Sequence, residues 1–404
     1  MLRPSGNADV TRSAILAYLG TSGGASRADL ARALGVSPAL MTQLVKDLIS
    51  DGLVRELAMS PSSGGRPARM LGLVASAGRV VGMKVSKDHV AFVETELSGK
   101  VMRAESWPFN ASSVTCLSIL VELVRGFRGS DGGVPILGIG VGVPGSVDEQ
   151  GSGVVDSSLL GWRQVPLGAV LSRELGVPVL VENNVNALAV AERLYGPGRD
   201  HADFLVVTIG EGVGAGFVTG GAVVRGSRGG AGEIGHIAAV ADGPRCTCGN
   251  HGCIEALIGE EALVAHARRS GVIPPEATMS DLQDRADSGN VLAQDIFRGA
   301  GQPLGRLVAG LVQVLDPEIV IVSGEGTRAW NHWKPGFEQA FRAALTSDRR
   351  SVSVIVESWD DESWARGAAA LVASTPFYSG ESSGEQGRRV RARLTTPVPE
   401  PVDS

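Results

Sequence analysis

The chain has 404 residues, 43% of them apolar and 20% charged, which is enough for two or three domains with sizeable cores. No apolar run approaches the ~20 residues that span a bilayer, and no signal-peptide core is evident, so we expect a cytoplasmic protein. The net charge of −6 excludes a protein that binds polyanions over its whole surface. Residues 1–74, however, carry eight Lys/Arg against five acids, which indicates a local nucleic-acid-binding module.

Residues 1–75 predict a winged helix-turn-helix domain. Ser26 and Asp29 have the spacing of a capping box at the start of a short helix, which Gly35 ends with a tight turn. A second helix is expected over 37–50, because its opening Ser-Pro combines an N-cap with a proline that the first helical position tolerates.

The second helix has two faces. Its apolar face is expected to be buried and consists of Leu40, Met41, Leu44, Val45, Leu48 and Ile49. The opposite face suits a DNA major groove, because Gln and Thr can reach base edges and Lys a phosphate. A hairpin over 53–59 and 68–74 follows, with a Gly-Gly-Arg-Pro tip that suits a minor groove. The predicted DNA contacts are Ser37, Ala39, Thr42, Gln43, Lys46, Gly65, Arg66 and Pro67. A three-helix packing or dimerisation module is the alternative.

From residue 79 the sequence alternates between short apolar strands and helices, which predicts an α/β body of two lobes. Lobe 1 is expected over 79–200, completed by a C-terminal helix at 362–373, and lobe 2 over 201–361. A glycine-rich loop, Gly210–Gly216, follows the first strand of lobe 2.

The last segment, 376–404, is rich in Gly, Ser, Pro and Arg and poor in apolar residues, so we expect a disordered tail. An auxiliary DNA contact through its arginines is the less favoured alternative.

Three of the four cysteines lie within eight residues, close after a histidine. Their spacing is H-x9-C-x-C-x4-C, and one imidazole with three thiolates would fill a tetrahedral zinc shell without an open position. A structural zinc ion is therefore predicted. From spacing alone, His251 competes for the place of the histidine ligand. The expected ligands are His236, Cys246, Cys248 and Cys253.

These motifs together resemble the ROK family of repressors, open reading frames and sugar kinases, over roughly residues 11–373. The resemblance rests on the Gly-Gly-Arg-Pro tip, the loop Gly142–Asp148, the motif at 182–186, the run Gly229–His236 and the cysteine cluster. It implies a two-lobed actin- and hexokinase-like fold and the same zinc site. It also implies sugar contacts at Asn183, Asn184, Glu233, His236 and Glu255.

Two departures from the kinases of this family bear on function. Where kinases have a catalytic aspartate, this chain has Asn184, whose amide cannot act as a general base, a loss of ~10²–10⁴-fold. Where they have an Asp-x-Gly-Gly-Thr phosphate loop, the chain reads Lys84-Val-Ser-Lys-Asp88. No catalytic residue is therefore assigned.

The resemblance then implies a sugar-responsive transcriptional regulator, most often a repressor. It would bind operator DNA as a dimer or tetramer and sense a sugar or sugar phosphate in a kinase-like cleft. The alternatives are an active ATP-dependent sugar kinase with a DNA-binding domain, and a repressor controlled by a protein partner.

Overall fold

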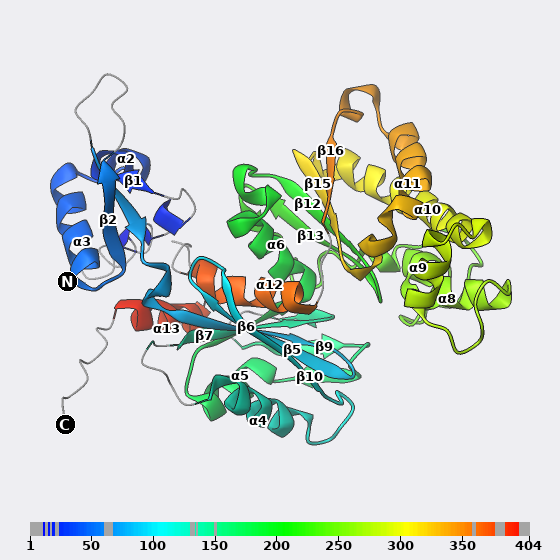
Figure 1. The fold of residues 1–404 in the computed structure, drawn as a ribbon, viewed down its shortest axis with the longest axis horizontal. Helices are drawn as coiled ribbons and strands as arrows, with labels where there is room; N and C mark the ends of the chain where they lie inside the picture. Colours follow the sequence, from blue (N-terminus) through cyan, green and yellow to red (C-terminus); the bar gives the residue numbers. More distant parts are fainter. Residues whose placement is uncertain are drawn as a thin grey trace. The chain divides into compact units, whose positions relative to one another are not determined.

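The computed structural model describes residues 11–12, 15–16, 18–20, 24–59, 68–129, 134, 136–148, 152–357, 361–375 and 384–395. The chain divides into two compact units (Figure 1). Unit 1 comprises Met1–Tyr195 and Asp361–Ser404, and unit 2 comprises Gly196–Asp360. Within the described ranges, every helix is too short or too polar to cross a membrane.

The N-terminal part of unit 1 has the winged-helix elements that local sequence signals predict. Ser26 and Asp29 form the capping box of the first helix, and Gly35 ends it in the left-handed region at φ 63°. The Ser37 hydroxyl accepts a hydrogen bond from the Leu40 N–H at 3.3 Å. The elements are β1 (Ala25–Ser26), α2 (Arg27–Leu34), α3 (Pro38–Ser50), β2 (Val54–Met59) and β3 (Arg69–Leu73), with sheet order β1-β3-β2.

One residue of α3 departs from the expected pattern. Met41, Leu44, Val45 and Leu48 are buried, but Leu40 is 46% exposed. At 100° per residue, Leu40 lies at the edge of the stripe that those four define, so the prediction that it is buried is wrong.

The body of unit 1 contains a five-stranded sheet of order β11-β7-β4-β5-β6. Strands β4, β7 and β11 are parallel, and β4, β5 and β6 are antiparallel. The edge strand β6 is missing from the predicted elements because most of its side chains are exposed and form no apolar run. The strands are β4 (Arg79–Val85), β5 (His89–Glu96), β6 (Val101–Pro108), β7 (Ile136–Val143) and β11 (Val179–Asn183).

Helices cover both faces of this sheet. Helix α12 lies on one face, and α4 and α5 lie on the other (Figure 1). A small sheet of order β10-β9-β8 completes the body. The bounds are α4 (Cys116–Arg128), β8 (Ser146–Val147), β9 (Val155–Ser157), β10 (Trp162–Val165), α5 (Leu167–Leu175), α6 (Asn184–Tyr195) and α12 (Asp361–Ser374).

Two glycines allow α12 to rest directly on the sheet backbone. A Cβ atom at Gly82 would lie 1.9 Å from the Ala365 carbonyl oxygen, and one at Gly140 would lie 1.8 Å from that of Ala368. The sheet and the alanine-rich helix therefore pack with no side chain between them at these points.

The C-terminal segment is not wholly a disordered tail. Residues Gly384–Thr395 form helix α13, and its Val390 is completely buried. The Arg389 guanidinium donates to the Ser172 hydroxyl at 3.0 Å, and that of Arg393 to the Ile136 carbonyl at 3.1 Å. These tertiary contacts compensate for the low apolar content, so the prediction of disorder is wrong for 384–395.

Unit 2 has a sheet with the same strand plan as the body of unit 1, in the order β14-β13-β12-β15-β16. Strands β12, β15 and β16 are parallel, and β12, β13 and β14 are antiparallel. The strands are β12 (Phe204–Ile209), β13 (Val213–Thr219), β14 (Ala222–Val223), β15 (Ile319–Ser323) and β16 (Ser353–Val356).

The expected glycine-rich loop, Gly210–Gly216, is a loop only in its first three residues. Gly214 and Gly216 belong to β13, where they lie opposite Thr208 and Val206 of β12. A run of glycines favours a loop from sequence alone. Glycine also suits a strand, however, where another part of the backbone packs closely against it.

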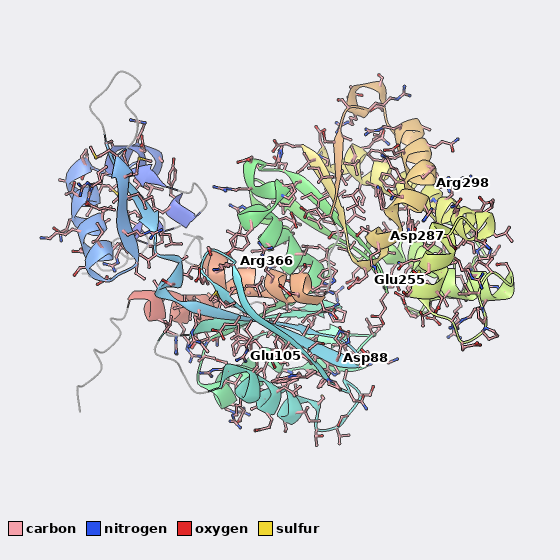
Figure 2. The ribbon with its side chains drawn as sticks, viewed as in Figure 1. Asp88, Glu105, Glu255, Asp287, Arg298 and Arg366 are labelled. Carbon is pink, nitrogen blue, oxygen red and sulfur yellow. The ribbon has the colours of Figure 1, made fainter. Side chains whose placement is uncertain are left out.

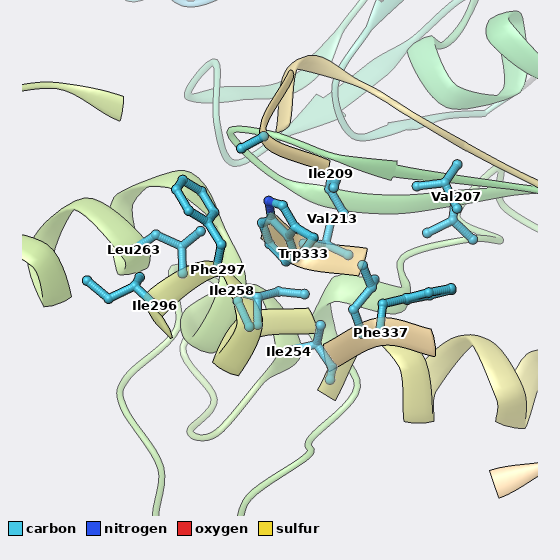
Figure 3. Packing of buried hydrophobic residues seen from close by; sticks show 14 of the residues in the cluster. Val207, Ile209, Val213, Ile254, Ile258, Leu263, Ile296, Phe297, Trp333 and Phe337 are labelled. Carbon is cyan, nitrogen blue, oxygen red and sulfur yellow. The ribbon is translucent and has the colours of Figure 1, made fainter. Parts of the chain in front are cut away.

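The helices of unit 2 enclose an apolar core against its sheet (Figure 3). Periodicity alone does not predict the whole of α11, because Pro335 lies inside it and interrupts the helical pattern. The bounds are α7 (Ile254–Ile258), α8 (Glu260–Arg269), α9 (Met279–Asp287), α10 (Val291–Leu315), the 3-10 helix η4 (Glu325–Ala329) and α11 (Trp330–Ala344).

We expect Gly140→Ala to lower the free energy of unfolding by about 2–3 kcal/mol, because its methyl group would overlap the α12 backbone. Gly310→Ala is the matched control, since it is exposed inside α10 with no atom near its added Cβ. Removal of that glycine should stabilise the protein by about 0.5–1 kcal/mol. Urea denaturation measures both, and equal effects would contradict the close packing.

Candidate functional sites

Four side chains that can ligate a metal converge in unit 2. The ligand atoms of His236, Cys246, Cys248 and Cys253 all lie within 4.8 Å of one another, although the residues span 18 positions of the chain. Two antiparallel bridges, Ala238 with Cys253 and Arg245 with His251, fold the connecting segment back on itself.

The spacing of these atoms fits a tetrahedral ion. Metal–sulfur bonds of ~2.3 Å place two thiolates ~3.8 Å apart, and a thiolate and an imidazole nitrogen ~3.5 Å apart. The Sγ atoms of Cys248 and Cys253 are 3.8 Å apart, and Cys246 Sγ lies 3.5 Å from His236 Nδ1. His251 is not in the group, and its Nδ1 lies 3.3 Å from the Gly243 carbonyl instead. The four residues can therefore hold a metal ion.

The thiols differ in their environments. Burial, and then the neighbouring thiols of Cys248 and Cys246, together raise the pKa of Cys253 to about 12. The Asn250 backbone N–H lowers the pKa of Cys248. A cation is the group that would stabilise three thiolates at such short distances.

Two carboxylates lie beside this group. Glu233 precedes the 3-10 turn that carries His236, and its Oε2 lies 3.8 Å from the histidine Nε2. Burial raises the pKa of Glu233; His236 lowers it in part, and Glu255 raises it. The histidine thus has one ring nitrogen at the thiols and the other directed toward a carboxylate.

Glu255 lies in the first turn of α7, two residues after Cys253 (Figure 2). Its Oε2 accepts a hydrogen bond from the Val213 N–H at 3.1 Å, and its Oε1 lies 3.5 Å from the Thr247 hydroxyl. The structure therefore brings three of the predicted sugar contacts together in unit 2, and Thr247 joins them.

The other two predicted sugar contacts belong to unit 1. The Asn183 amide donates to the Gly145 carbonyl at 2.8 Å, and its Oδ1 accepts from the N–H groups of Val185 and Asn186. Asn183 thus caps α6. Asn184 Oδ1 accepts from the Val185 N–H at 3.0 Å.

Several backbone N–H groups in the turn after β4, in the turn after β12 and in β13 are already hydrogen-bonded within the chain. In the turn after β4, the Ser86 N–H donates to the His89 carbonyl at 3.0 Å. In unit 2, the N–H of Gly210 donates to the Gly212 carbonyl, and that of Ala215 to the Gly232 carbonyl. These N–H groups are therefore committed to contacts within the chain and are not available to an anion.

An ion-pair cluster occupies the end of the β4–β5 hairpin, whose turn contains Asp88 (Figure 2). Lys84 Nζ lies 2.7 Å from Asp361, at the start of α12, and 5.4 Å from the centre of the Trp364 ring. His89 contacts two carboxylates, Asp88 at 2.7 Å and Asp361 at 3.0 Å. Lys84 therefore links the hairpin to α12.

The exposed face of α3 carries the predicted DNA-contact residues of that helix. Ala39, Thr42, Gln43 and Lys46 are exposed, and Leu40 lies among them. A helical-wheel plot would have placed this leucine at the edge of the buried stripe. The predicted contacts Gly65, Arg66 and Pro67 lie outside the described residues.

Two polar side chains of this face make bonds within the helix. The Thr42 hydroxyl donates to the Pro38 carbonyl at 2.8 Å, and the Gln43 amide donates to Asp47 at 2.8 Å. Both side chains would have to exchange these bonds in order to reach base edges.

Comparison with known proteins separates an N-terminal DNA-binding domain from the α/β body. A model of the ROK family matches residues 80–375, and a model of the MarR family matches residues 9–62. A xylose repressor of Bacillus spizizenii is 28% identical over 300 residues, which cover 74% of this chain and 77% of the relative.

Two solved structures share the fold. A ROK family transcriptional regulator, described as a homologue of the Escherichia coli Mlc protein, aligns with a TM-score of 0.81 and 24% identity. The alignment covers 96% of this chain and all of that chain. A ROK family glucokinase from Streptomyces griseus, in complex with glucose and AMPPNP, aligns with a TM-score of 0.65 and 26% identity, over 73% of this chain and 99% of that chain.

The Lys84–Asp361 pair generates a pH-dependent prediction. Burial raises the pKa of Asp361, but Lys84 and then His89 lower it more, so the net pKa lies below its usual value. The pair therefore stabilises the folded state above the unfolded-state pKa of ~4, and this contribution is lost as the pH falls through the lowered pKa. Because the aspartate is 41% exposed, the contribution should stay below about 1 kcal/mol.

We expect Lys84→Met to reduce the unfolding free energy at pH 6 relative to wild type, with a difference that shrinks below pH 4. Lys87→Met, at an exposed position of the same hairpin, is the control. Urea denaturation between pH 3 and 7 measures the difference, and one that is independent of pH would contradict the ion-pair role.

Proposed function

Because the chain belongs to the ROK family over residues 80–375, joined to a MarR-type winged helix, we propose that it is a sugar-responsive transcriptional regulator. The exposed face of α3 is the observation that carries the proposal. In this role the chain binds operator DNA through the winged helix, most simply as a repressor, and a sugar or sugar phosphate bound by the ROK body changes the DNA affinity.

In this proposal, α3 enters the major groove. Gln43 and Thr42 read base edges, Lys46 contacts a phosphate, and the N-terminus of the helix at Ser37 faces the backbone. Leu40 adds an apolar contact that suits a thymine methyl group. The wing residues Gly65, Arg66 and Pro67 complete the interface from the minor groove. A dimer or tetramer would present two such helices to a palindromic site.

The effector site is proposed to include Glu233, His236 and Glu255, with Asn183 and Asn184 as further contacts. Glu233 is the carboxylate best placed to accept sugar hydroxyls. Its Oε2 lies 3.8 Å from His236 Nε2, whereas one oxygen of Glu255 already accepts the Val213 N–H. Sugar binding to carboxylate and imidazole pairs selects epimers, because a wrong hydroxyl leaves buried groups unpaired.

We further propose that the metal is zinc and that it is structural. Four protein ligands complete its shell, so no position remains for a reacting water molecule. The ion would fix the orientation of His236 and of the start of α7, which carry two of the proposed sugar contacts.

Sugar phosphorylation is not the proposed activity. Asn184 cannot take a proton from a hydroxyl, and Lys84 pairs with Asp361 where a kinase has its phosphate loop. Because a glucokinase shares the fold, kinase activity should be measured directly. ADP formation with a panel of sugars would establish the kinase alternative.

We expect the full-length protein to bind DNA from upstream of its own gene, and one sugar to shift that affinity at least tenfold, or ~1.4 kcal/mol. Fluorescence anisotropy at fixed salt measures this with a panel of neutral and phosphorylated sugars that includes xylose. Glu233→Gln should abolish the sugar response and leave DNA binding intact. Lys46→Met should weaken binding to all sequences and reduce the salt slope by about one.

Three results would change the proposal. Failure to bind any upstream DNA at moderate salt would contradict a regulator. DNA binding without a response to any sugar would favour control by a protein partner. Binding that Lys46→Met leaves unchanged would contradict the placement of α3.

Metal analysis of the purified protein should find one zinc per chain. Cys246→Ser and His236→Ala should each reduce the content toward zero and weaken the sugar response, because the metal holds the effector loop. Cys116→Ser and His251→Ala are the controls, since neither residue belongs to the ligand group, and both should retain the ion. Loss of zinc in His251→Ala would assign the fourth ligand to that residue instead.

A further inference from the structure

Unit 2 contains a cavity whose lining residues differ from those of the proposed metal and sugar sites. The cavity has a volume of about 280 Å³ and lies among η4, the starts of α8, α9 and α11, and the turn at Gly210. This volume is just below the ~300 Å³ typical of the smallest drug-sized pockets, so a small molecule would fill it.

Negative charge dominates the walls of this cavity. Glu260 and Glu325 line it, against one cation, Arg328. Burial raises the pKa of Glu260, and the charges of Glu211 and Glu325 raise it further, which shows that three carboxylates act on one region. A Cβ atom at Gly210 would lie 2.6 Å from the Glu325 carboxylate, so this acid lies directly against the turn after β12. An anionic ligand would be repelled here.

The floor of the cavity is aromatic and contains an unused donor. The rings of Phe297 and Trp333 lie 6.0 Å apart, with Ile258 and Leu263 nearby (Figure 3). Trp333 is 2% exposed, and its indole N–H has no hydrogen-bond partner in the described part of the chain. Figure 3 shows that nitrogen on the side of the ring toward Phe297, which also lines the cavity. A buried donor without a partner is costly, and a ligand acceptor atom would satisfy it.

The carboxylates are not arranged for a metal ion. Among the described residues, only the histidine and cysteine group brings three or more metal-ligating side chains close enough together. The acids therefore surround a space wider than a metal-binding site. The aromatic rings below them suit an organic cation, because such a cation can form ion pairs with the carboxylates and is attracted to the ring faces.

We propose that this cavity binds a small organic cation, an ammonium compound that carries a hydrogen-bond acceptor for the Trp333 indole. The ammonium group lies between Glu260 and Glu325, and the apolar part of the ligand packs on Phe297 and Trp333. The site is separate from the proposed sugar contacts and would give the protein a second ligand. The same charges exclude the polyphosphate of a nucleotide from the turn at Gly210.

Isothermal titration calorimetry with the zinc-loaded full-length protein tests the proposal. Tyramine, 4-ethylphenol and 3-(4-hydroxyphenyl)propionate share one skeleton and carry charges of plus one, zero and minus one. Tyramine should bind at least about tenfold more tightly than the neutral compound, and the anion should bind most weakly. Ethanolamine and putrescine extend the test to cations without an aromatic ring.

Variants assign the binding to this cavity. Glu260→Gln and Glu325→Gln keep the shape of the side chain and should each reduce tyramine affinity about tenfold, with a smaller effect on 4-ethylphenol. Glu261→Gln is the matched control, since Glu261 follows Glu260 but does not line the cavity. Trp333→Phe, which keeps the aromatic floor and removes the donor, should weaken tyramine several-fold.

The proposal is overturned if none of the three cations binds at millimolar concentration, or if the neutral compound binds as tightly as tyramine. It is also overturned if ADP binds and the two glutamine variants do not change tyramine affinity. These outcomes do not depend on DNA or sugar binding, so they separate this site from the proposed regulatory function.

Discussion

Contact of backbone with backbone through glycine is the constraint on which both units depend. In unit 1, Gly82 and Gly140 let α12 lie directly on the central strands. In unit 2, Gly301 and Gly336 do the same between α10 and α11, where a Cβ at Gly336 would lie 1.9 Å from the Arg298 carbonyl. The 55 glycines and the low aromatic content of the chain are consistent with this close packing. Small residues allow the helices and sheets to lie close together. This close packing fixes the positions of the ends of the strands and of the side chains there.

At the turn after β12 and at the end of β4, the chain places charged side chains against its own backbone or against each other. The Glu325 carboxylate lies against Gly210, and the Val213 N–H donates to Glu255. On unit 1, Lys84 is held by Asp361. Each of these contacts is internal and formed without ligand. The polar groups at these two turns are therefore committed to contacts within the chain.

The sequence predicted the helix caps and the turn that depend only on neighbouring residues. The capping box at Ser26, the turn at Gly35 and the N-cap at Ser37 each involve residues four or fewer positions apart, and each formed as expected. The cysteine spacing likewise predicted a four-residue group, and the geometry agrees with the expected His236 rather than with the alternative His251. Tertiary packing decided the rest. Strand β6, helix α13 and the strand character of Gly214 depend on partners far along the chain, which periodicity does not reveal.

The division of the chain into units has a consequence for its synthesis. Unit 2 is one uninterrupted stretch, whereas the sheet of unit 1 needs α12, which is translated more than 160 residues after Tyr195. As the chain leaves the ribosome, the winged helix and then unit 2 can complete their cores, while the glycine-lined face of the first sheet still lacks its cover. The last helices to emerge close that face. A truncated product would therefore display an intact second lobe and an open first one.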